Sequence, residues 1–204
     1  MKQGILFVVS APSGAGKTTL VKALRARMKG FAVSVSHTTR TQRPGEQHGL
    51  DYFFVERLEF ERMVARGAFV EYARVFDNFY GTARETLETA LAKGQDVMLE
   101  IDWQGARQIK TLIPACLSIF VLPPSRDTLA ERLRGRGQDD EEIIARRMRD
   151  AISEMSHYAE YDYLIVNDDF EAALEEMRCI VIASRLQTAH QAERLGGLID
   201  NLLA

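Results

Sequence analysis

Short apolar runs alternate with longer polar segments along this chain. Residues 5–9 form a continuous apolar run that leads into a Gly-rich turn, and residues 20–28 then place apolar side chains at helical spacing. Comparable apolar runs occupy residues 97–101, 117–122 and 163–166, and each is followed by a polar segment with helical periodicity. Strands that are apolar on both faces and separated by helices predict a parallel sheet of the α/β class.

One long segment, residues 37–93, interrupts this rhythm. It begins with a polar loop around Arg43-Pro44-Gly45 and continues with alternating or aromatic runs at residues 51–55 and 69–76. Alternation of this kind is typical of strands with one solvated face. We therefore expect an inserted, partly antiparallel subdomain.

A second irregular piece covers residues 134–147. It contains Gly135, Gly137 and a run of four acidic residues, which favours a mobile flap between helices. The last long segment, residues 170–195, keeps helical apolar spacing as far as Gly196-Gly197. This pattern predicts continuous helix up to that glycine pair.

Length and composition favour one soluble globular domain. The 204 residues are 46% apolar and 27% charged, and no repeat or linker divides them. We expect a single domain, residues 1–204, with its core at residues 1–36 and 94–204, the insertion at about 37–93 and the lid at about 134–147. A formal charge of -3 argues against a nucleic-acid partner.

Cysteine usage and hydropathy indicate the compartment. Two cysteines, Cys116 and Cys179, cannot make a disulfide framework. The first apolar run is too short for a signal peptide, and no run approaches the length that spans a membrane. We expect a cytoplasmic protein without a membrane partner.

The turn after the first strand has the chemistry of a phosphate site. It reads Ala11-Pro12-Ser13-Gly14-Ala15-Gly16-Lys17-Thr18, followed by Thr19, and it joins a predicted strand to a predicted helix. This is the context that a P-loop requires, although Ala11 stands where the strict pattern has glycine. The glycines allow backbone N–H groups to approach phosphate oxygens, and the helix N-terminus adds positive potential. Lys17 would reach the β and γ phosphates of ATP, and Thr18 would bind Mg²⁺.

A P-loop alone does not distinguish a kinase from a motor or a regulatory GTPase. Asp102-Trp103-Gln104-Gly105 matches the Asp-x-x-Gly motif of GTPases, but the chain has no Asn-Lys-x-Asp segment that would recognise guanine on the P-loop nucleotide. Glu100 and Asp102 end an apolar run, at the edge where open α/β sheets bind ligands. They suit an acidic pair that would contact Mg²⁺ through water. A role as helix N-cap explains either acid equally well.

A second polar stretch follows the strand predicted at residues 32–35. Residues 36–46 read Ser-His-Thr-Thr-Arg-Thr-Gln-Arg-Pro-Gly-Glu, and residues 49–54 read Gly-Leu-Asp-Tyr-Phe-Phe. Two arginines, a serine and a tyrosine in so short a stretch can surround a dianionic phosphate, because arginine forks match its oxygens.

At this point the chain resembles the guanylate kinases, a family of P-loop nucleoside monophosphate kinases. The resemblance continues over nearly the full length through Phe69-Val70-Glu71-Tyr72, Asn78-Phe79-Tyr80-Gly81-Thr82, Glu100-Ile101-Asp102-Trp103-Gln104-Gly105, the flap arginines and Asn167-Asp168-Asp169. It implies a three-layer P-loop kinase core with a parallel sheet, an inserted nucleotide monophosphate-binding subdomain and a lid. It also implies that ATP and GMP react to give ADP and GDP, with Mg²⁺ as the cofactor.

The resemblance implies the residues of the GMP site. They are Ser36, Arg40, Arg43, Tyr52, Glu71, Tyr80, Gly81, Thr82, Glu100 and Asp102. Glu71 and Thr82 would recognise guanine, whose N1–H and exocyclic amine are adjacent donors that one carboxylate can accept together. Adenine presents an acceptor at N1 and would be rejected. Taken one at a time, Glu71 and Thr82 are equally typical of solvated hairpin positions, and Tyr52 and Tyr80 of core aromatics.

The flap is rich in arginine, and the chain has no lysine after Lys110. A planar guanidinium suits a transferring phosphoryl group. By resemblance, the catalytic residues are Lys17, Arg132, Arg136 and Arg147, and the ATP site comprises residues 11–19 together with Asn167 at the adenine. Asn167 is also typical of a plain turn, and Arg134, Arg146 and Arg149 of a salt-bridged helix surface.

The expected partners are therefore ATP and GMP, in purine nucleotide metabolism and GMP recycling. A non-catalytic module of the same family that binds peptides is disfavoured by the intact Gly16-Lys17-Thr18, and a sugar phosphate kinase of the same fold by Glu71 and Thr82. No general base is expected, because phosphoryl transfer depends on positioning and charge stabilisation. The helical tail at residues 195–203 leaves a homo-oligomer open.

Overall fold

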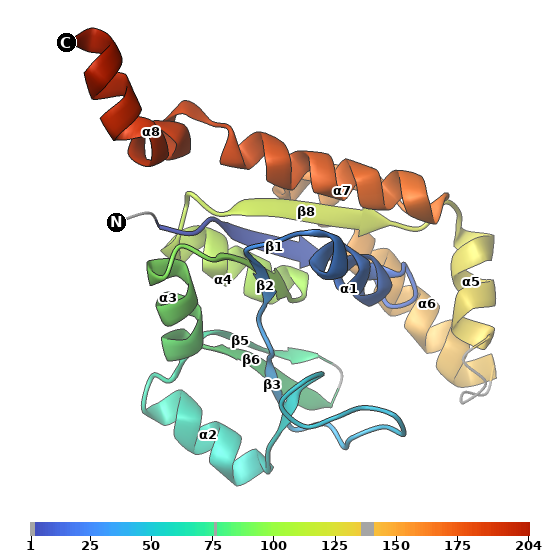
Figure 1. Cartoon of the computed structure of the whole chain (residues 1–204). Coiled ribbons are helices and arrows are strands. Elements are labelled where there is room, and N and C mark those ends of the chain that lie inside the picture. The colour runs from blue at the N-terminus through green and yellow to red at the C-terminus, as the bar shows by residue number, and fades with distance from the viewer. Residues whose placement is uncertain (1–2, 76, 136–140) are drawn as a thin grey trace.

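The chain is built around a parallel sheet. The structure, a computed structural model, describes residues 3–75, 77–135 and 141–204. Its main sheet has five parallel strands in the order β2-β7-β1-β8-β9 (Figure 1). They are β1 (Leu6–Ser10), β2 (Phe31–Val33), β7 (Asp96–Glu100), β8 (Leu117–Leu122) and β9 (Tyr163–Val166). Each strand overlaps an apolar run of the sequence, which confirms the predicted parallel sheet.

Helices cover both faces of this sheet. α1 (Lys17–Arg27) and α7 (Phe170–Arg185) pack on one face, against the odd-numbered apolar residues of β1. α3 (Arg84–Ala92) and α4 (Trp103–Leu112) pack on the other face, against the even-numbered ones. Side chains alternate between the two faces of a strand, so a strand buried on both faces carries an unbroken apolar run. The result is the predicted three-layer α/β core of P-loop kinase type.

A second, smaller sheet forms most of the inserted region. Its strands lie in the order β4-β3-β6-β5 and comprise β3 (His37–Thr38), β4 (Phe53–Phe54), β5 (Phe69–Val75) and β6 (Asn78–Ala83). β6 is antiparallel to both β3 and β5, whereas β3 and β4 are parallel. The sheet is therefore partly antiparallel, and it lies apart from the main sheet, in the lower part of Figure 1.

The apolar pattern does not predict two helices of this region. α2 (Arg57–Ala65) buries Phe60 and Met63 against the small sheet. α3 buries Leu87 and Leu91 in the cluster beneath the main sheet. Each helix has nine residues and only two buried ones, so its periodicity in the sequence is weak. By its packing, α3 belongs with the core, although it falls within residues 37–93.

The segment predicted as a flap between helices, residues 134–147, overlaps two helices: it includes the last residue of one and the first seven of the next. α5 (Arg126–Arg134) begins at Ser125, whose hydroxyl accepts a hydrogen bond from the backbone N–H of Thr128 at 3.0 Å. α6 (Glu141–Met155) packs against α5, and a short 3₁₀ helix, Tyr158–Glu160, then leads to β9. Residues 136–140, within the predicted lid, lie outside the described residues.

A break divides the C-terminal helical region, so the prediction of continuous helix over residues 170–195 is wrong. α7 ends at Arg185, whose Nε donates to Asp96 Oδ2 at 2.6 Å and whose Nη2 donates to the backbone oxygen of Lys29 at 3.2 Å. These bonds fix the end of α7 at the edge of the sheet. Leu186 is already 62% exposed, so extending the same helix would bury no further apolar surface.

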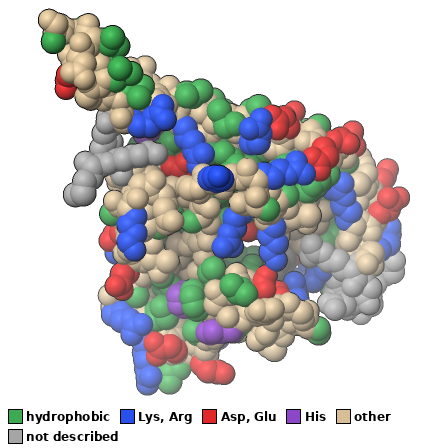
Figure 2. All heavy atoms as spheres, viewed as in Figure 1, with side chains coloured by type: hydrophobic (Ala, Val, Ile, Leu, Met, Phe, Trp, Pro, Cys, Tyr) green, Lys and Arg blue, Asp and Glu red, His purple; other side chains and the backbone are tan. Residues whose placement is uncertain are grey.

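The last helix, α8 (Thr188–Leu203), stands off the body of the molecule (Figure 1). It runs through Gly196 and Gly197, where an added Cβ would meet no other atom. Glycine weakens a helix by about 1 kcal/mol but does not by itself end one. Hydrophobic side chains are visible along this helix in Figure 2. Over the described ranges, no helix combines the length and apolar character needed to cross a membrane.

Candidate active site

The P-loop joins β1 to α1 at the carboxyl edge of the main sheet. Gly14 and Gly16 have φ angles of 95° and 92°, in the left-handed region that favours glycine. A Cβ at Gly14 would lie 2.9 Å from the side chain of Leu129, and one at Gly16 would collide with the amide of Asn167. The first turn of α1 contains no acidic residue and Gly16 supplies no side-chain cap, so the positive end of the helix is open to an anion.

Lys17 and Thr18 connect the P-loop with the end of β7. Lys17 Nζ donates to the backbone oxygen of Ile101 at 3.4 Å, and Thr18 Oγ1 donates to Glu100 Oε2 at 3.0 Å. β1 and β7 are neighbouring parallel strands, so their carboxyl ends bring an ammonium, a hydroxyl and a carboxylate together. Within the described residues, no three His, Cys, Asp or Glu side chains form a metal cluster. Thr18 and Glu100 nevertheless fit Mg²⁺, which takes few protein oxygens and completes its shell with water and substrate phosphates.

Asp102 differs from Glu100 in its partners. It is the N-cap of α4, because its Oδ1 accepts from the backbone N–H of Gly105 at 3.0 Å. Its Oδ2 accepts from the side-chain amide of Gln104, also at 3.0 Å. The helix-cap explanation therefore applies to Asp102, whereas the Glu100 carboxylate faces Thr18.

Arg40, Tyr52 and Tyr80 lie together where the acceptor phosphate is expected. The Arg40 guanidinium lies 5.3 Å from the centre of the Tyr52 ring, and the Tyr52 and Tyr80 rings meet edge to face at 5.9 Å. Burial raises the pKa of Tyr52 to about 12, so its hydroxyl stays protonated and can donate to a phosphate oxygen. Figure 2 shows Lys and Arg side chains beside the hollow between the core and the insertion.

Glu46 belongs to this site although the sequence analysis gives it no role. Its Oε1 accepts from Arg40 Nη2 at 2.7 Å, and its Oε2 accepts from the backbone N–H of Arg43 at 2.8 Å. Burial alone would raise the pKa of Glu46, but these two hydrogen bonds lower it overall. Glu46 follows Arg43 by three residues in a basic loop, and this position is the feature of the sequence that could have indicated its role. The Arg43 side chain itself is exposed, while Ser36 is buried beside β3.

Glu71 and Thr82 form a buried pair across the hairpin of β5 and β6. They occupy facing positions of the ladder, and Thr82 Oγ1 donates to Glu71 Oε1 at 2.6 Å. Burial raises the pKa of Glu71 to about 7; the hydrogen bond from Thr82 lowers it, and the charge of Asp102 raises it. Gly105 permits this approach, because a Cβ there would lie 2.5 Å from Glu71 Oε2. Gly81, next to Thr82 on β6, faces Tyr72.

Asn167 lies between the P-loop and α5. It is 5% exposed, its Nδ2 donates to the backbone oxygen of Ala15 at 2.7 Å, and its backbone oxygen accepts from Arg132 Nη2 at 3.2 Å. Asn167 thus braces the P-loop and orients Arg132, and its contact with adenine stays a prediction. Arg147 is half-buried on α6, and Arg136 lies outside the described residues.

Comparison with known proteins indicates the family of the chain. Residues 3–184 match the family model described as guanylate kinase. The guanylate kinase of Methylococcus capsulatus is 66% identical to this chain, and those of Salmonella typhimurium and Escherichia coli K12 are each 58% identical, in every case over the full length of both chains.

Solved structures agree as well. The crystal structure of guanylate kinase from Anaplasma phagocytophilum, 36% identical, matches 93% of this chain and 90% of its own with a TM-score of 0.79. A shikimate kinase from Bacteroides thetaiotaomicron, 16% identical, has a TM-score of 0.50 over 87% of this chain and 98% of its own, which reflects the fold alone. On the sequence matches above all, the chain belongs to the guanylate kinase family.

Proposed function

We propose that this chain transfers the γ-phosphoryl group of ATP to GMP, giving ADP and GDP, and that Glu71 and Thr82 select guanine. The buried pair is the observation that carries the proposal, since its members are only 3% and 0% exposed. A carboxylate held out of water needs hydrogen-bond donors. Guanine supplies two adjacent donors, whereas adenine would place an acceptor against the same oxygens.

The donor nucleotide binds at the P-loop. Residues 11–19 surround its phosphates with backbone N–H groups, and Lys17 contacts the β and γ phosphates. Asn167 supports this loop through Ala15 and lies at the adenine side. Thr18 would hold Mg²⁺ directly, and Glu100 or Asp102 would contact it through water. When bound, Mg²⁺ neutralises charge that builds up on the phosphate oxygens.

The acceptor phosphate binds opposite the P-loop. Its ligands are Ser36, Arg40, Arg43, Tyr52 and Tyr80, and Gly81 belongs to the same GMP site. Glu46 holds Arg40 in place before GMP arrives, so less side-chain freedom is lost on binding. Arg43, which is exposed, turns inward when GMP binds. The phosphate is thereby aligned with the γ-phosphoryl group, and this alignment is the main catalytic requirement.

The lid supplies the remaining positive charge. Arg132, Arg136 and Arg147 close over the triphosphate and stabilise the charge on the transferring group. Closure also expels water, which would otherwise accept the phosphoryl group. In this description the chain is one domain, with the boundary of the GMP-binding insertion drawn before α3.

A coupled assay for ADP release tests the function. The panel comprises GMP, dGMP, AMP, UMP, CMP and ribose phosphates. GMP is expected to be the best acceptor, and AMP a poor one. Equal rates with AMP and GMP would contradict guanine selection, and preference for a ribose phosphate would favour the sugar phosphate alternative. Absence of any transfer, with GMP still bound, would favour the non-catalytic module.

α8 supports a further proposal, that two copies associate. Leu198, Leu202 and Leu203 are 54%, 74% and 82% exposed on a helix that stands off the body. Burying such side chains favours association. Light scattering on the purified protein is expected to give twice the chain mass, and Leu202→Asp to give the mass of one chain.

We place the protein in the cytoplasm, because Cys116 and Cys179 are both free. Cell fractionation tests this location.

A further inference from the structure

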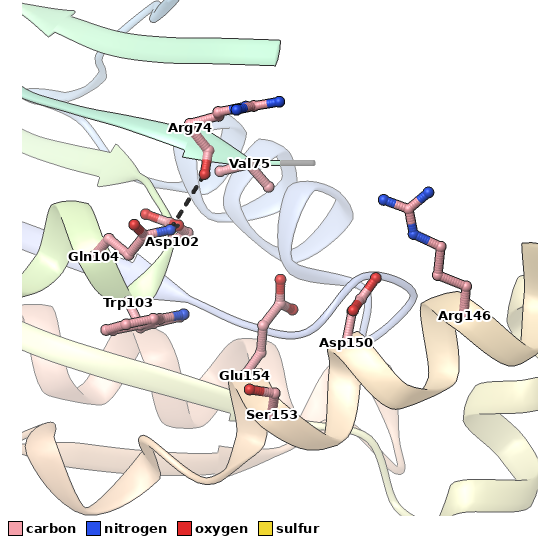
Figure 3. Close-up of a pocket in the computed structure, with 9 residues that line it drawn as sticks. All are labelled: Arg74, Val75, Asp102, Trp103, Gln104, Arg146, Asp150, Ser153 and Glu154. Atoms are coloured by element: carbon pink, nitrogen blue, oxygen red, sulfur yellow. Dashed lines mark hydrogen bonds between the residues drawn. The ribbon is translucent and has the colours of Figure 1, made fainter. Parts of the chain in front are cut away.

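Two cavities of about 240 Å³ each differ in place and in charge. The first lies beside the site described above, between Asp102 at the start of α4 and the carboxylates of Asp150 and Glu154 on α6 (Figure 3). Carboxylates outnumber arginines in its lining, three to two. The second cavity has the opposite balance, so it is the one of the two that attracts anions.

The second cavity lies at the edge of the main sheet opposite the P-loop. Its lining includes Ile5 and Gly30, which directly precede β1 and β2, and Asp96, which begins β7. These strands are parallel, so their amino ends share one edge, whereas the P-loop follows the carboxyl end of β1. His190 and Arg194 of α8 form part of the remaining wall, near the point where α8 leaves the body (Figure 1). The cavity is therefore separate from the proposed ATP and GMP sites.

The two arginines of this cavity are held in place by other groups. Arg185 Nε donates to Asp96 Oδ2 at 2.6 Å, and its Nη2 donates to the backbone oxygen of Lys29 at 3.2 Å. Arg194 Nε and Nη2 both donate to Gln191 Oε1, at 3.1 and 2.8 Å, and Gln191 Nε2 donates to the backbone oxygen of Arg185 at 2.9 Å. In both arginines Nη1 has no acceptor among the described residues. A ligand would thus meet two donors that are already positioned, so less side-chain freedom is lost on binding.

The cavity is cationic although the chain as a whole is acidic. Three positive charges come from Lys29, Arg185 and Arg194. Among the described residues that line the cavity, only Asp96 is negative, so the formal charge is +2 with His190 neutral, against -3 for the chain. The Asp96 side chain is 4% exposed, and its oxygens accept from a backbone N–H at 2.9 Å and from Arg185 Nε. The cavity therefore offers positive charge and hydrogen-bond donors to a ligand.

Size and charge together define the class of ligand. Drug-sized ligands occupy pockets of about 300 to 1,000 Å³, so a cavity of about 240 Å³ fits a smaller molecule. A phosphate group carries a charge of about -1.5 to -2 near pH 7 and has three strong acceptor oxygens. This charge matches the cavity, and guanidinium groups suit phosphate oxygens.

We propose that this cavity is a second anion site, which binds a small ligand with one or two phosphate groups between α8 and the amino edge of the main sheet. Lys29, Arg185 and Arg194 contact the phosphate oxygens. The ligand thereby ties the first half of α8 to the body. The inference does not depend on the function proposed above, because none of these three residues belongs to the ATP or GMP site.

Calorimetric titration with inorganic phosphate and with pyrophosphate tests this site. Ionic strength is held constant, and saturating ADP and GMP fill the active site. The parent is expected to bind both anions saturably, and pyrophosphate more tightly. Arg194→Gln should weaken pyrophosphate binding about tenfold, because it removes a charge-assisted hydrogen bond. Arg62→Gln removes the same charge from an exposed position on α2 and should bind as the parent does.

A second variant and a local measurement place the ligand. Lys29→Gln changes the body side of the cavity and should also weaken pyrophosphate binding, so the result does not depend on how α8 tolerates one substitution. Arg185 is left unchanged, because it also fixes the end of α7. Pyrophosphate should slow hydrogen exchange of the backbone amides at residues 188–194 in the parent and not in Arg194→Gln.

Three results would overturn the proposal. They are no saturable binding to the parent with its active site filled, parent-like affinity in both Arg194→Gln and Lys29→Gln, and protection from exchange confined to the P-loop. Vesicles that contain phosphatidylglycerol are the last arm of the test. Binding to these vesicles without any binding of pyrophosphate would reject a small ligand in favour of a membrane surface.

Discussion

The two ends of the cleft are built differently. At the base-recognition end, Glu71 and Thr82 are buried, face each other across a β ladder and are already hydrogen-bonded. At the phosphate-transfer end, Thr18 and Arg43 are exposed, and Arg132 and Arg147 lie on two helices that flank residues 136–140. Under the proposed function, the pair that would select guanine is preformed on two strands, whereas the transfer site would be completed by closure of the lid.

If the lid completes the site only on closure, its arginines should affect the chemical step more than substrate binding. We expect Arg147→Met to lower kcat by about 10³ while KM for GMP changes little, because the guanidinium meets the phosphoryl oxygens in the transition state. Steady-state kinetics with both substrates measure this split. Methionine keeps much of the apolar stem, so thermal unfolding should be nearly unchanged.

Arg149→Met is the matched control for that prediction. Arg149 lies two residues further along α6 and is exposed. Its variant should stay near parent activity. Equal losses in the two variants, or a loss confined to GMP affinity in Arg147→Met, would mean that the lid acts in the ground state and that the two ends of the cleft are less different than we infer.

A substitution of Lys17 tests the P-loop, the part of the phosphate-transfer end that does not belong to the lid. Lys17 is half-buried and lies outside the apolar clusters of the core, so Lys17→Ala should leave the fold intact and lower kcat by about 10² to 10³, the usual cost of one electrostatic contact. ADP release measures the rate, and circular dichroism checks the fold. Normal turnover in this variant would remove the P-loop assignment.

Glu71 tests the preformed end. Glu71→Gln retains one acceptor but turns an NH₂ group toward a guanine donor, and we expect kcat/KM for GMP to fall roughly 10- to 100-fold. KM for ATP should change little, because the pair lies away from the P-loop. Initial rates at varied GMP and fixed ATP give the answer. An unchanged KM for GMP would mean that the base is recognised elsewhere.

Much of the fold and of the candidate site could be predicted from the sequence. The rest depends on contacts that form only in the folded chain. The main sheet is predictable because strands buried on both faces leave unbroken apolar runs. The P-loop is predictable because Gly14 and Gly16 adopt the left-handed backbone conformation that favours glycine. The role of Glu46 depends instead on a contact made in the folded chain, the closing of its loop onto Arg40. The break after Arg185 likewise depends on tertiary contacts, because Arg185 bonds Asp96 and the backbone of Lys29 at the end of the sheet.

The smallest effect that we predict is a pH dependence of GMP binding set by Glu71. Burial raises the pKa of Glu71 to about 7, and only the ionised carboxylate can accept both guanine donors. KM for GMP should therefore rise as the pH falls, by about threefold between about pH 7.5 and 6.5. The readout is KM for GMP, because the expected change is in binding of the base.

Glu71→Gln is the control that isolates this effect. The phosphate of GMP also takes up a proton, with a pKa of about 6, and this contribution is shared by the parent and the variant. The difference between their profiles thus belongs to Glu71. We expect the variant to keep the shallow phosphate component and to lose the rest. Identical profiles in both proteins, or a KM that falls on acidification, would show that Glu71 is not the carboxylate in contact with the base, and the contrast between a preformed and an assembled end of the cleft would lose its main support.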